Sequence, residues 1–345
     1  MSTFIQLHML TAYPPANMNR DDLGRPKTAR MGGVERLRVS SQSLKRTWRT
    51  SDLFQEALSG HLGTRTKRLG TEVEKSLLEG GVKQKQAREW ARSIADVFGA
   101  IKKEGTEIEQ LAHISPEERA AVDSLTETLI AENREPTEEE LRLLRATPNA
   151  ADIGLFGRML AADPGYNIDA ACQVAHAITV HPVVIEDDYF TAVDDLNSGD
   201  EDMGAAHIGE TGFAAGLFYS YICIDRDQLV KNLGGDDTLA DKAIGALTEA
   251  AVKVSPRGKQ NSFGSRAYAS WILAEKGSQQ PRSLSVAFLK PVYGNDQAGE
   301  AIQAIQRQRD HFDRVYGACA DDRYEIDATE GSGSLEELRA FVTRH

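Results

Sequence analysis

The sequence predicts an α+β protein in which a layered unit of the ferredoxin or RNA-recognition-motif (RRM) type carries a large helical insertion and an extended β-hairpin. Three observations lead to this class. Alternating apolar segments typical of strands occur near both ends of the chain, residues 61–148 are rich in helix formers, and residues 186–216 combine acidic residues with repeated glycines. With 345 residues, of which 41% are hydrophobic, the chain is long enough to bury a sizeable core.

The first strand is predicted at residues 4–10, where apolar side chains alternate with Gln6 and His8. Such alternation indicates a strand that packs against the core on one face only. Gln6 and His8 would then face water or, in an RNA-binding sheet, a nucleotide. Pro14 ends this strand, because proline cannot donate a hydrogen bond to the ladder.

Residues 17–49 form a strongly basic stretch. They contain nine lysine or arginine residues and three acidic ones, whereas the formal net charge of the whole chain is −12. Clustered positive charge suits a polyanion-binding surface, because counterion release rewards it. A solvated surface without a ligand is the alternative. The negative net charge argues against indiscriminate nucleic-acid binding but permits a local basic groove.

A helix is predicted to begin within this stretch. Ser40 or Ser41 is suited to cap a helix that runs through Leu58. Unpaired amide groups and the helix dipole make such an N-terminus attractive to an oxyanion. A phosphate bound there would be within reach of the Ser40 hydroxyl, Gln42 and Lys45.

The segment that follows is predicted to be mainly helical. Its helices are expected at residues 72–78, 84–101, 116–133 and 137–146, with breaks at glycine and proline residues. Residues 169–180 are predicted as a further apolar helix. His176 and His181 are five residues apart and would not share a helical face as a metal pair does, so each is interpreted as a packed or hydrogen-bonded histidine.

Gly157-Arg158-Met159 is a second candidate contact with a nucleic acid. Arg158 would place a cation on a phosphate, and Met159 would place a thioether against a base. The alternative is that Met159 fills a gap in the core, which is a common role of methionine.

An extended hairpin is predicted after these residues. Residues 186–202 contain eight acidic residues and no basic one, so this segment cannot provide a phosphate contact. The aromatic and aliphatic alternation of residues 217–224 predicts a strand. Asp225 is suited to cap the helix that follows.

The C-terminal third is predicted to alternate helices with short extended segments. A helix is expected at residues 239–254, a buried strand at 285–289, and a last helix capped by Ser334. The loop of residues 257–261, which contains Lys259, lies either on the basic groove or in an exposed position without a role.

Cysteine usage and hydropathy indicate a cytoplasmic protein without a membrane segment. Cys172, Cys223 and Cys319 are scattered and odd in number, which favours reduced thiols over disulfides or a zinc site. No apolar run approaches membrane-spanning length, and the N-terminus does not resemble a signal peptide.

One pair of carboxylates leaves an enzymatic alternative open. Asp21 and Asp22 lie beside Arg20 in the basic stretch, and such a pair could hold Mg²⁺ and cleave a bound strand as a metal-dependent ribonuclease does. The preferred interpretation is that these carboxylates orient arginines and shape the loop.

Taken together, three groups of residues closely resemble the CasC family, the backbone subunit of type I-E CRISPR Cascade. The first group is Asn19-Arg20-Asp21-Asp22, Lys27, Gly32-Gly33 and the run from Arg38 to Arg46. The second is residues 175–179 with 190–196, and the third is Ala206-His207-Ile208-Gly209. These blocks span residues 1–58 and about 153–235.

The resemblance implies a hand-like protein that binds CRISPR RNA (crRNA). Its palm would comprise residues 1–58, 182–188 and 223–345, its helical fingers residues 59–181, and its thumb hairpin residues 189–222. The residues expected to bind RNA are Arg20, Lys27, Ser40, Gln42, Lys45, Arg46, Arg49, Arg158, Met159 and Lys259. The thumb residues expected to reach a neighbouring subunit and the RNA are Phe190, Thr191, Val193, Leu196 and His207.

The resemblance also implies a scaffold rather than an enzyme, with no catalytic residue, metal ion or cofactor. Several copies would assemble as a helical oligomer along one crRNA and present its bases for pairing with target DNA in antiviral defence. Sequence specificity would then come from base pairing, while the protein recognises backbone and shape. The other expected partners are the large and small Cascade subunits and the subunits at the 5' and 3' ends of the crRNA.

Overall fold

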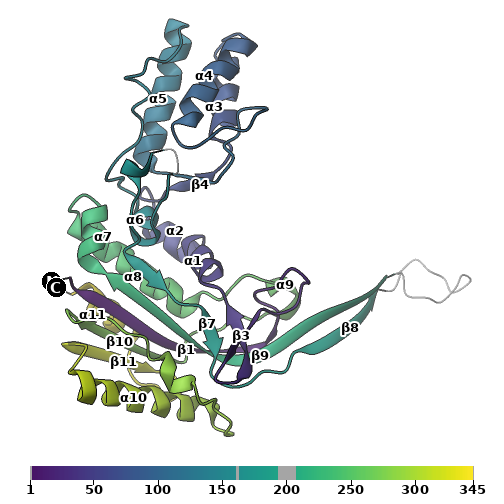
Figure 1. Ribbon diagram of the computed structural model, residues 1–345, viewed down its shortest axis with the longest axis vertical. Coiled ribbons are helices and arrows are strands. Elements are labelled where there is room, and N and C mark those ends of the chain that lie inside the picture. The colour runs from purple at the N-terminus through teal and green to yellow at the C-terminus, as the bar shows by residue number, and fades with distance from the viewer. Residues whose placement is uncertain (1, 161–162, 193–206, 345) are drawn as a thin grey trace, which may run out of the picture.

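The computed structural model describes residues 2–160, 163–192 and 207–344, and its architecture is mixed α+β (Figure 1). Within these residues nine strands form one sheet in the order β11-β10-β1-β9-β7-β3-β2, and β6 and β8 also pair with β9. All the pairings are antiparallel. The predicted α+β class is therefore confirmed.

The strands of the large sheet are β1 (Phe4–Ala16), β2 (Thr28–Met31), β3 (Val34–Val39), β6 (Cys172–Val174), β7 (Ala177–Thr179), β8 (Glu186–Ala192), β9 (His207–Asp225), β10 (Trp271–Gly277) and β11 (Asp322–Asp327). The helices around it are α1 (Ser41–Arg49), α2 (Asp52–Ala57), α6 (Ala151–Phe156), α7 (Arg226–Asn232), α8 (Asp237–Lys253), α9 (Gln260–Phe263), α10 (Gln297–Tyr316) and α11 (Leu335–Thr343). A ferredoxin-like unit has the order strand, helix, strand, strand, helix, strand. Six elements of this chain occur in that order, with other elements between them: β1, α1, β6, β9, α8 and β10.

Helices cover both faces of the large sheet. One face packs against α1, α2, α8 and α11, and the other packs against α10 and the short 3-10 helix η2 (Ser285–Phe288). Gln6 and His8 are consequently buried, at 1% and 0% exposure, so the expectation that β1 packs on one face only is wrong. Alternation shows which side chains share a face, but it cannot show that a helix 290 residues later covers that face.

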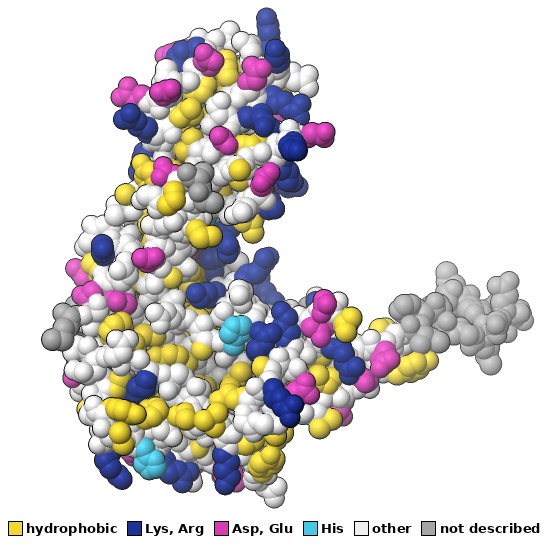
Figure 2. All heavy atoms as spheres, in the orientation of Figure 1, with side chains coloured by type: hydrophobic (Ala, Val, Ile, Leu, Met, Phe, Trp, Pro, Cys, Tyr) yellow, Lys and Arg dark blue, Asp and Glu magenta, His cyan; other side chains and the backbone are white. Residues whose placement is uncertain are grey.

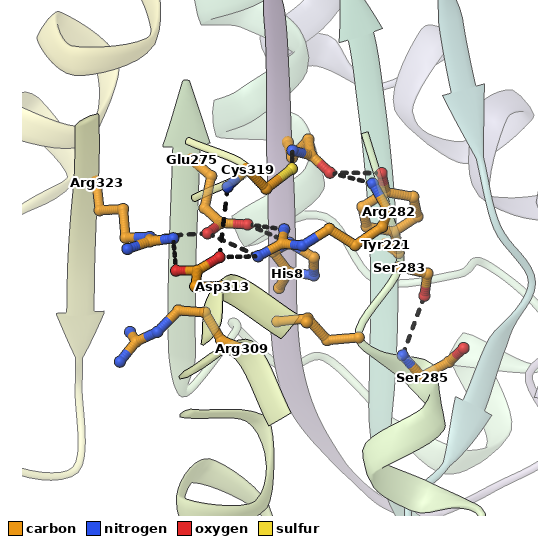
Figure 3. Close-up of polar contacts among 12 residues, drawn as sticks. His8, Tyr221, Glu275, Arg282, Ser283, Ser285, Arg309, Asp313, Cys319 and Arg323 are labelled. Carbon is orange, nitrogen blue, oxygen red and sulfur yellow. Dashed lines mark hydrogen bonds and ion pairs between the residues drawn. The ribbon is translucent and has the colours of Figure 1, made fainter. Parts of the chain in front are cut away.

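Buried charges hold the face beneath α10 together. Glu275 accepts hydrogen bonds from His8 at 3.2 Å and from Arg323 at 2.8 Å, and it also pairs with Arg282 (Figure 3). Burial alone would raise the pKa of Glu275, but these hydrogen bonds and charges hold it well below its ordinary value. Burial lowers the pKa of His8, which therefore donates to Glu275 as a neutral ring.

The helical insertion forms a lobe with its own hydrophobic core. It comprises α3 (Leu69–Glu79), α4 (Gln84–Asp96), α5 (Pro116–Glu132) and the two-stranded sheet of β4 (Thr64–Thr66) and β5 (Ala112–Ile114). Figure 1 shows this helical lobe projecting from the sheet. The predicted helix at residues 137–146 is wrong, because this segment forms turns.

Three other predicted segments differ from the structure. Residues 169–180 form β6 and β7 instead of a helix, and both strands pair with β9. The lobe therefore ends before residue 172, not at 181. The single helix expected from Ser40 to Leu58 is two helices, because Ser51 caps α2 separately. Residues 285–288 form η2 instead of a strand.

The predicted hairpin is an arm that continues the sheet outward. Strand β8 pairs with the first part of β9, with Glu186 opposite Phe213 at one end and Ala192 opposite His207 at the other. The second part of β9 lies in the sheet beside β1. We refer to residues 186–192 and 207–213 as the hairpin arm (Figure 1). Val193 and Leu196, two of the expected thumb residues, lie outside the described residues.

Two further expectations concern thiols and membranes. Cys172, Cys223 and Cys319 are free and buried, as predicted, and burial raises the pKa of Cys172 to about 12. Among the helices of the described residues, none has the length and apolar character needed to cross a membrane.

Candidate nucleic-acid interface

The N-terminus of α1 is built as the sequence predicts. The Ser40 hydroxyl accepts a hydrogen bond from the amide of Ser43 at 3.3 Å, and the Ser40 amide donates to Asn19 Oδ1 at 2.9 Å. Leu44 and Trp48 are buried, which fixes the rotation of the helix. Gln42 and Arg46 are therefore exposed on its outer side, and Lys45 is half-buried.

Polar contacts order the basic loop that precedes β2. Asp21 Oδ1 accepts hydrogen bonds from the amides of Leu23 at 3.0 Å and Arg25 at 2.9 Å. The amide of Lys27 donates to the carbonyl of Asn19 at 2.7 Å. Asn19 also accepts the hydrogen bond from the Ser40 amide, and Asn19 therefore fixes the basic loop against the N-terminus of α1.

The contacts of Asp21 bear on the ribonuclease alternative. One carboxylate oxygen of Asp21 is engaged by two backbone amides, which is the loop-shaping role preferred from the sequence. Asp22 is exposed. Over the described part of the chain, no three His, Cys, Asp or Glu side chains gather as ligands for a metal ion.

Lys45 connects α1 to the segment that carries Met159. Its ammonium group lies 5.5 Å from the centroid of the Phe156 ring and 3.5 Å from the carbonyl oxygen of Cys172. Phe156 is the last residue of α6, and Gly157 ends this helix with φ +80°. The loop that begins at Gly157 is thereby held next to α1.

Within this loop Arg158 and Met159 point in opposite directions. Arg158 is buried, donates to both carboxylate oxygens of Glu118 at 2.8 Å and donates to the carbonyl of Arg145 at 2.9 Å. The expectation that Arg158 contacts a phosphate is therefore corrected, because its guanidinium is enclosed and paired. Met159 is 79% exposed, which excludes the alternative of a core filler.

Arg49 takes part in a buried polar joint between the helical lobe and the sheet. Asp152 accepts hydrogen bonds from His113 of β5 at 2.8 Å, from the amide of Gly63 at 2.8 Å and from Arg49 at 3.4 Å. Burial alone would raise the pKa of Asp152, but His113, Gly63 and Arg49 together hold it below its ordinary value. A Cβ atom on Gly63 would lie 2.9 Å from the His113 ring, so glycine is needed for this contact.

A second basic loop approaches Arg20 from the other side. Lys259 and Arg20 line one cavity of about 460 Å³ together with Phe190 of the hairpin arm. Arg25 forms an ion pair with Asp187 of the arm at 3.1 Å. The basic loop, the Lys259 loop and the base of the arm therefore meet at one place.

The arm presents its expected contact residues only in part. Phe190 is 42% exposed, and its ring lies against Gly209, where a Cβ atom would be 2.3 Å from it. Thr191 is exposed and pairs with Ile208 through the backbone. His207 is the first residue of β9 and pairs with Ala192.

The structure adds Arg38 and His176 to this surface. Arg38 Nη1 donates to His176 Nδ1 at 3.0 Å, so His176 is the hydrogen-bonded histidine expected from the sequence. Partial burial and the charges of Arg38 and Lys27 lower the pKa of His176. The alternation of residues 34–39 places Arg38 on the same side of β3 as Arg36, so the strand pattern alone could not separate the half-buried Arg38 from the buried Arg36.

The molecular surface is hollowed between the helical lobe and the hairpin arm (Figure 2). Figure 2 shows Lys and Arg side chains gathered along the hollow of this surface. Unlike Arg49 and Arg158, five of the predicted contacts form no ion pair within the described residues: Arg20, Lys27, Lys45, Arg46 and Lys259. Cations without carboxylate partners on a concave surface are available to a polyanion.

The fold and this surface define an α+β protein with a local cationic groove on an acidic chain. The family model of the CT1975-like protein matches residues 5–340. The chain therefore belongs to the CT1975-like family of CRISPR-associated proteins, which confirms the resemblance at the level of the family.

Two solved structures are similar over nearly the whole chain. A chain of a "CRISPR RNA-guided surveillance complex, pre-nicking" is 30% identical, with a TM-score of 0.80 and coverage of 98% of this chain and 99% of that chain. A chain of another "CRISPR RNA-guided surveillance complex" is 27% identical, with a TM-score of 0.61 and coverage of 97% and 92%. No curated protein matches this chain.

Proposed function

We propose that this protein is the crRNA-binding scaffold subunit of a type I-E Cascade complex in the cytoplasm. The large sheet with its helices would be the palm, the helical lobe the fingers, and the hairpin arm the thumb. Family membership and the similarity to chains of CRISPR RNA-guided surveillance complexes support a role in such a complex. The subunit would bind, assemble and present RNA without cutting it.

One observation carries the proposal. Five cations form no ion pair within the described residues, two of them (Lys45 and Arg46) lie on α1 close to its N-terminus, and Lys and Arg side chains gather along the hollow of the surface (Figure 2). An RNA strand that follows this surface would place phosphates on Lys45, Arg46 and the amides at the start of α1. Met159 and Phe190 are exposed apolar side chains, and they would contact bases of the bound strand.

Copies of the chain would share one crRNA, with the arm of each copy reaching to the next. This arrangement leaves sequence recognition to pairing between guide and target DNA. The large and small subunits and the two end subunits would complete the complex.

The test is RNA retention by the protein purified together with its operon partners. Lys45→Ala and Arg20→Ala should each lower the amount of bound RNA at moderate salt, and they should do so for all RNA sequences, because phosphate contacts carry no sequence information. Lys231→Ala, on α7, is the matched control and should retain wild-type amounts. Unchanged retention in both Lys45→Ala and Arg20→Ala would contradict the proposed interface.

The same preparation tests the ribonuclease alternative. A scaffold leaves the bound RNA and a complementary target RNA intact in the presence of Mg²⁺. Cleavage that disappears in Asp21→Ala or Asp22→Ala would instead establish a metal-dependent nuclease.

A further inference from the structure

A second cavity, of about 700 Å³, lies beside the C-terminal end of α1 and includes none of the residues expected to bind RNA. It is enclosed by the start of α2, the end of α8 and the loop of residues 255–268. Its size falls within the range of sites that hold small organic groups. The side chains that matter for its chemistry are Leu53, Lys253, Arg257, Asn261, Arg266 and Tyr268.

The loop that forms one wall of this cavity is held in place at three points. Ser255 Oγ donates to the carbonyl of Ala267 at 3.0 Å and accepts from its amide at 2.7 Å, which closes the base of the loop. A Cβ atom on Gly258 would lie 2.0 Å from the carbonyl oxygen of Met18, so the loop packs directly on the chain before the basic loop. The rings of Phe263 and Phe213 are 6.1 Å apart. The wall is therefore preorganised.

Apolar side chains of the cavity are exposed. Tyr268 is 67% exposed and Leu53 is 38% exposed, although both are large and apolar. An exposed tyrosine ring offers a stacking surface to a base, and this stacking tolerates any sequence. The amide of Asn261, also exposed, adds hydrogen-bonding groups to the same cavity.

Cations outnumber acids around these apolar groups. Lys253 is paired with Glu249 at 2.8 Å, and Asp52 is the acidic residue of the lining. Arg257 donates to the carbonyl of Thr50 at 2.9 Å, and Arg266 is exposed and forms no ion pair with any described residue. Two guanidinium groups are thus available to a phosphate.

The cavity continues the basic surface of α1. Arg257 is bonded to Thr50, the residue that directly follows Arg49. A strand that passes the exposed Arg46 towards the C-terminal end of α1 would therefore reach the cavity.

We infer that this cavity is an additional nucleotide site of the RNA groove. It takes one nucleotide of single-stranded RNA, with the base on Tyr268 and the phosphate on Arg257 and Arg266. This inference rests on the proposed function, because it assigns a further part of the same bound strand.

The experiment measures binding of a fluorescein-labelled, mixed-sequence single-stranded oligoribonucleotide to the full chain by anisotropy over a range of salt concentrations. Tyr268→Ala should weaken binding by about fivefold or more, because a fivefold loss of affinity corresponds to the low end of the free energy of stacking one base on an aromatic side chain. Arg266→Ala should reduce the slope of log affinity against log salt by about 0.7, as the loss of one phosphate contact does. The matched controls are Tyr316→Ala and Arg314→Ala, since both residues are exposed on α10, on the other face of the sheet.

The outcomes separate this inference from the proposed function. If the wild type binds RNA and Tyr268→Ala binds as tightly as Tyr316→Ala, the nucleotide site is overturned and the proposed function stands. If the wild type does not bind RNA at all, the proposed function fails first. Because Tyr268 and Arg266 are exposed, loss of the fold is not expected, and unchanged circular dichroism of both variants checks this. Ultraviolet crosslinking that maps labelled RNA to residues 257–268 in the wild type would support the site directly.

Discussion

Arg158 supports the candidate interface from inside the molecule, because its side chain is buried beneath the loop that exposes Met159. Its guanidinium bonds to Glu118 and to the carbonyl of Arg145, and Gly157 turns the chain so that Met159 emerges next to it. Glu118 also caps α5 through the capping box with Ser115. Arg158 therefore anchors the loop that exposes Met159.

This anchoring role predicts a difference in stability between two adjacent residues. Arg158→Ala should lower the free energy of unfolding by about 3–5 kcal/mol, because it leaves the buried Glu118 carboxylate without its cation. Met159→Ala should change it by less than about 0.5 kcal/mol, because Met159 is 79% exposed. Urea denaturation measures both, and equal stabilities would refute the anchoring role.

The joint at Asp152 connects three elements, α6, β5 and α1. The sequence does not predict this joint, because its members are far apart in the chain, and Arg49 is instead expected to bind RNA as part of the basic stretch. His113 and Gly63 lie 39 and 89 residues before Asp152. The capped helix starts at Asp225 and Ser334 are confirmed, and Ser40 is the cap of α1 among the two candidates Ser40 and Ser41. These predictions succeed because a cap and its partner lie within one helical turn.

The same difference between local and long-range contacts explains the other wrong predictions. Residues 169–180 have apolar positions compatible with either a helix or short strands, and only the pairing with β9 decides for strands. The sequence around Arg158 and Arg46 does not show which of the two is paired, because the partner of Arg158 is Glu118, 40 residues earlier on α5. Local chemistry thus predicts the capped start of α1, and long-range contacts decide which of the nearby cations form ion pairs.

The joint yields a prediction about the lobe. Asp152→Ala should lower the free energy of unfolding by about 2–4 kcal/mol, because His113 and the amide of Gly63 lose a buried acceptor. Asp123→Ala is the control, since Asp123 forms an exposed ion pair with Arg119 and should cost less than about 1 kcal/mol. Guanidinium denaturation monitored by tryptophan fluorescence compares the two, and equal effects would show that Asp152 is not a structural joint.

At the scale of the whole molecule, the cluster around Glu275 links stability to pH. The folded pKa of Glu275 lies below its ordinary value of 4.5, so its contribution is complete above pH 4.5 and is lost as the pH falls below it. The folded pKa of His8 lies below its ordinary value of 6.5, so protonation of the unfolded chain already costs stability below pH 6.5. Both groups therefore lower the stability of the folded protein as the pH falls.

We therefore expect the free energy of unfolding to fall as the pH is lowered from 7 towards 3, and most steeply below 4.5. Glu275→Gln should flatten the dependence below pH 4.5, besides lowering stability at neutral pH. Glu127→Gln, at an exposed position of α5, should keep the wild-type dependence. Thermal unfolding at a series of pH values measures these slopes, and an unchanged slope in Glu275→Gln would contradict the assignment.

Strand β9 has a mechanical consequence for an assembled complex. Its 19 residues run without a break from the hairpin arm into the middle of the sheet, where they are hydrogen-bonded to β1. At roughly 3.3 Å per residue such a strand behaves as a rod about 60 Å long. A load applied to the arm therefore reaches the interior of the same subunit as shear along the β1–β9 ladder. In the proposed assembly, tension between copies would be shared by these backbone hydrogen bonds, which lie side by side and are loaded together.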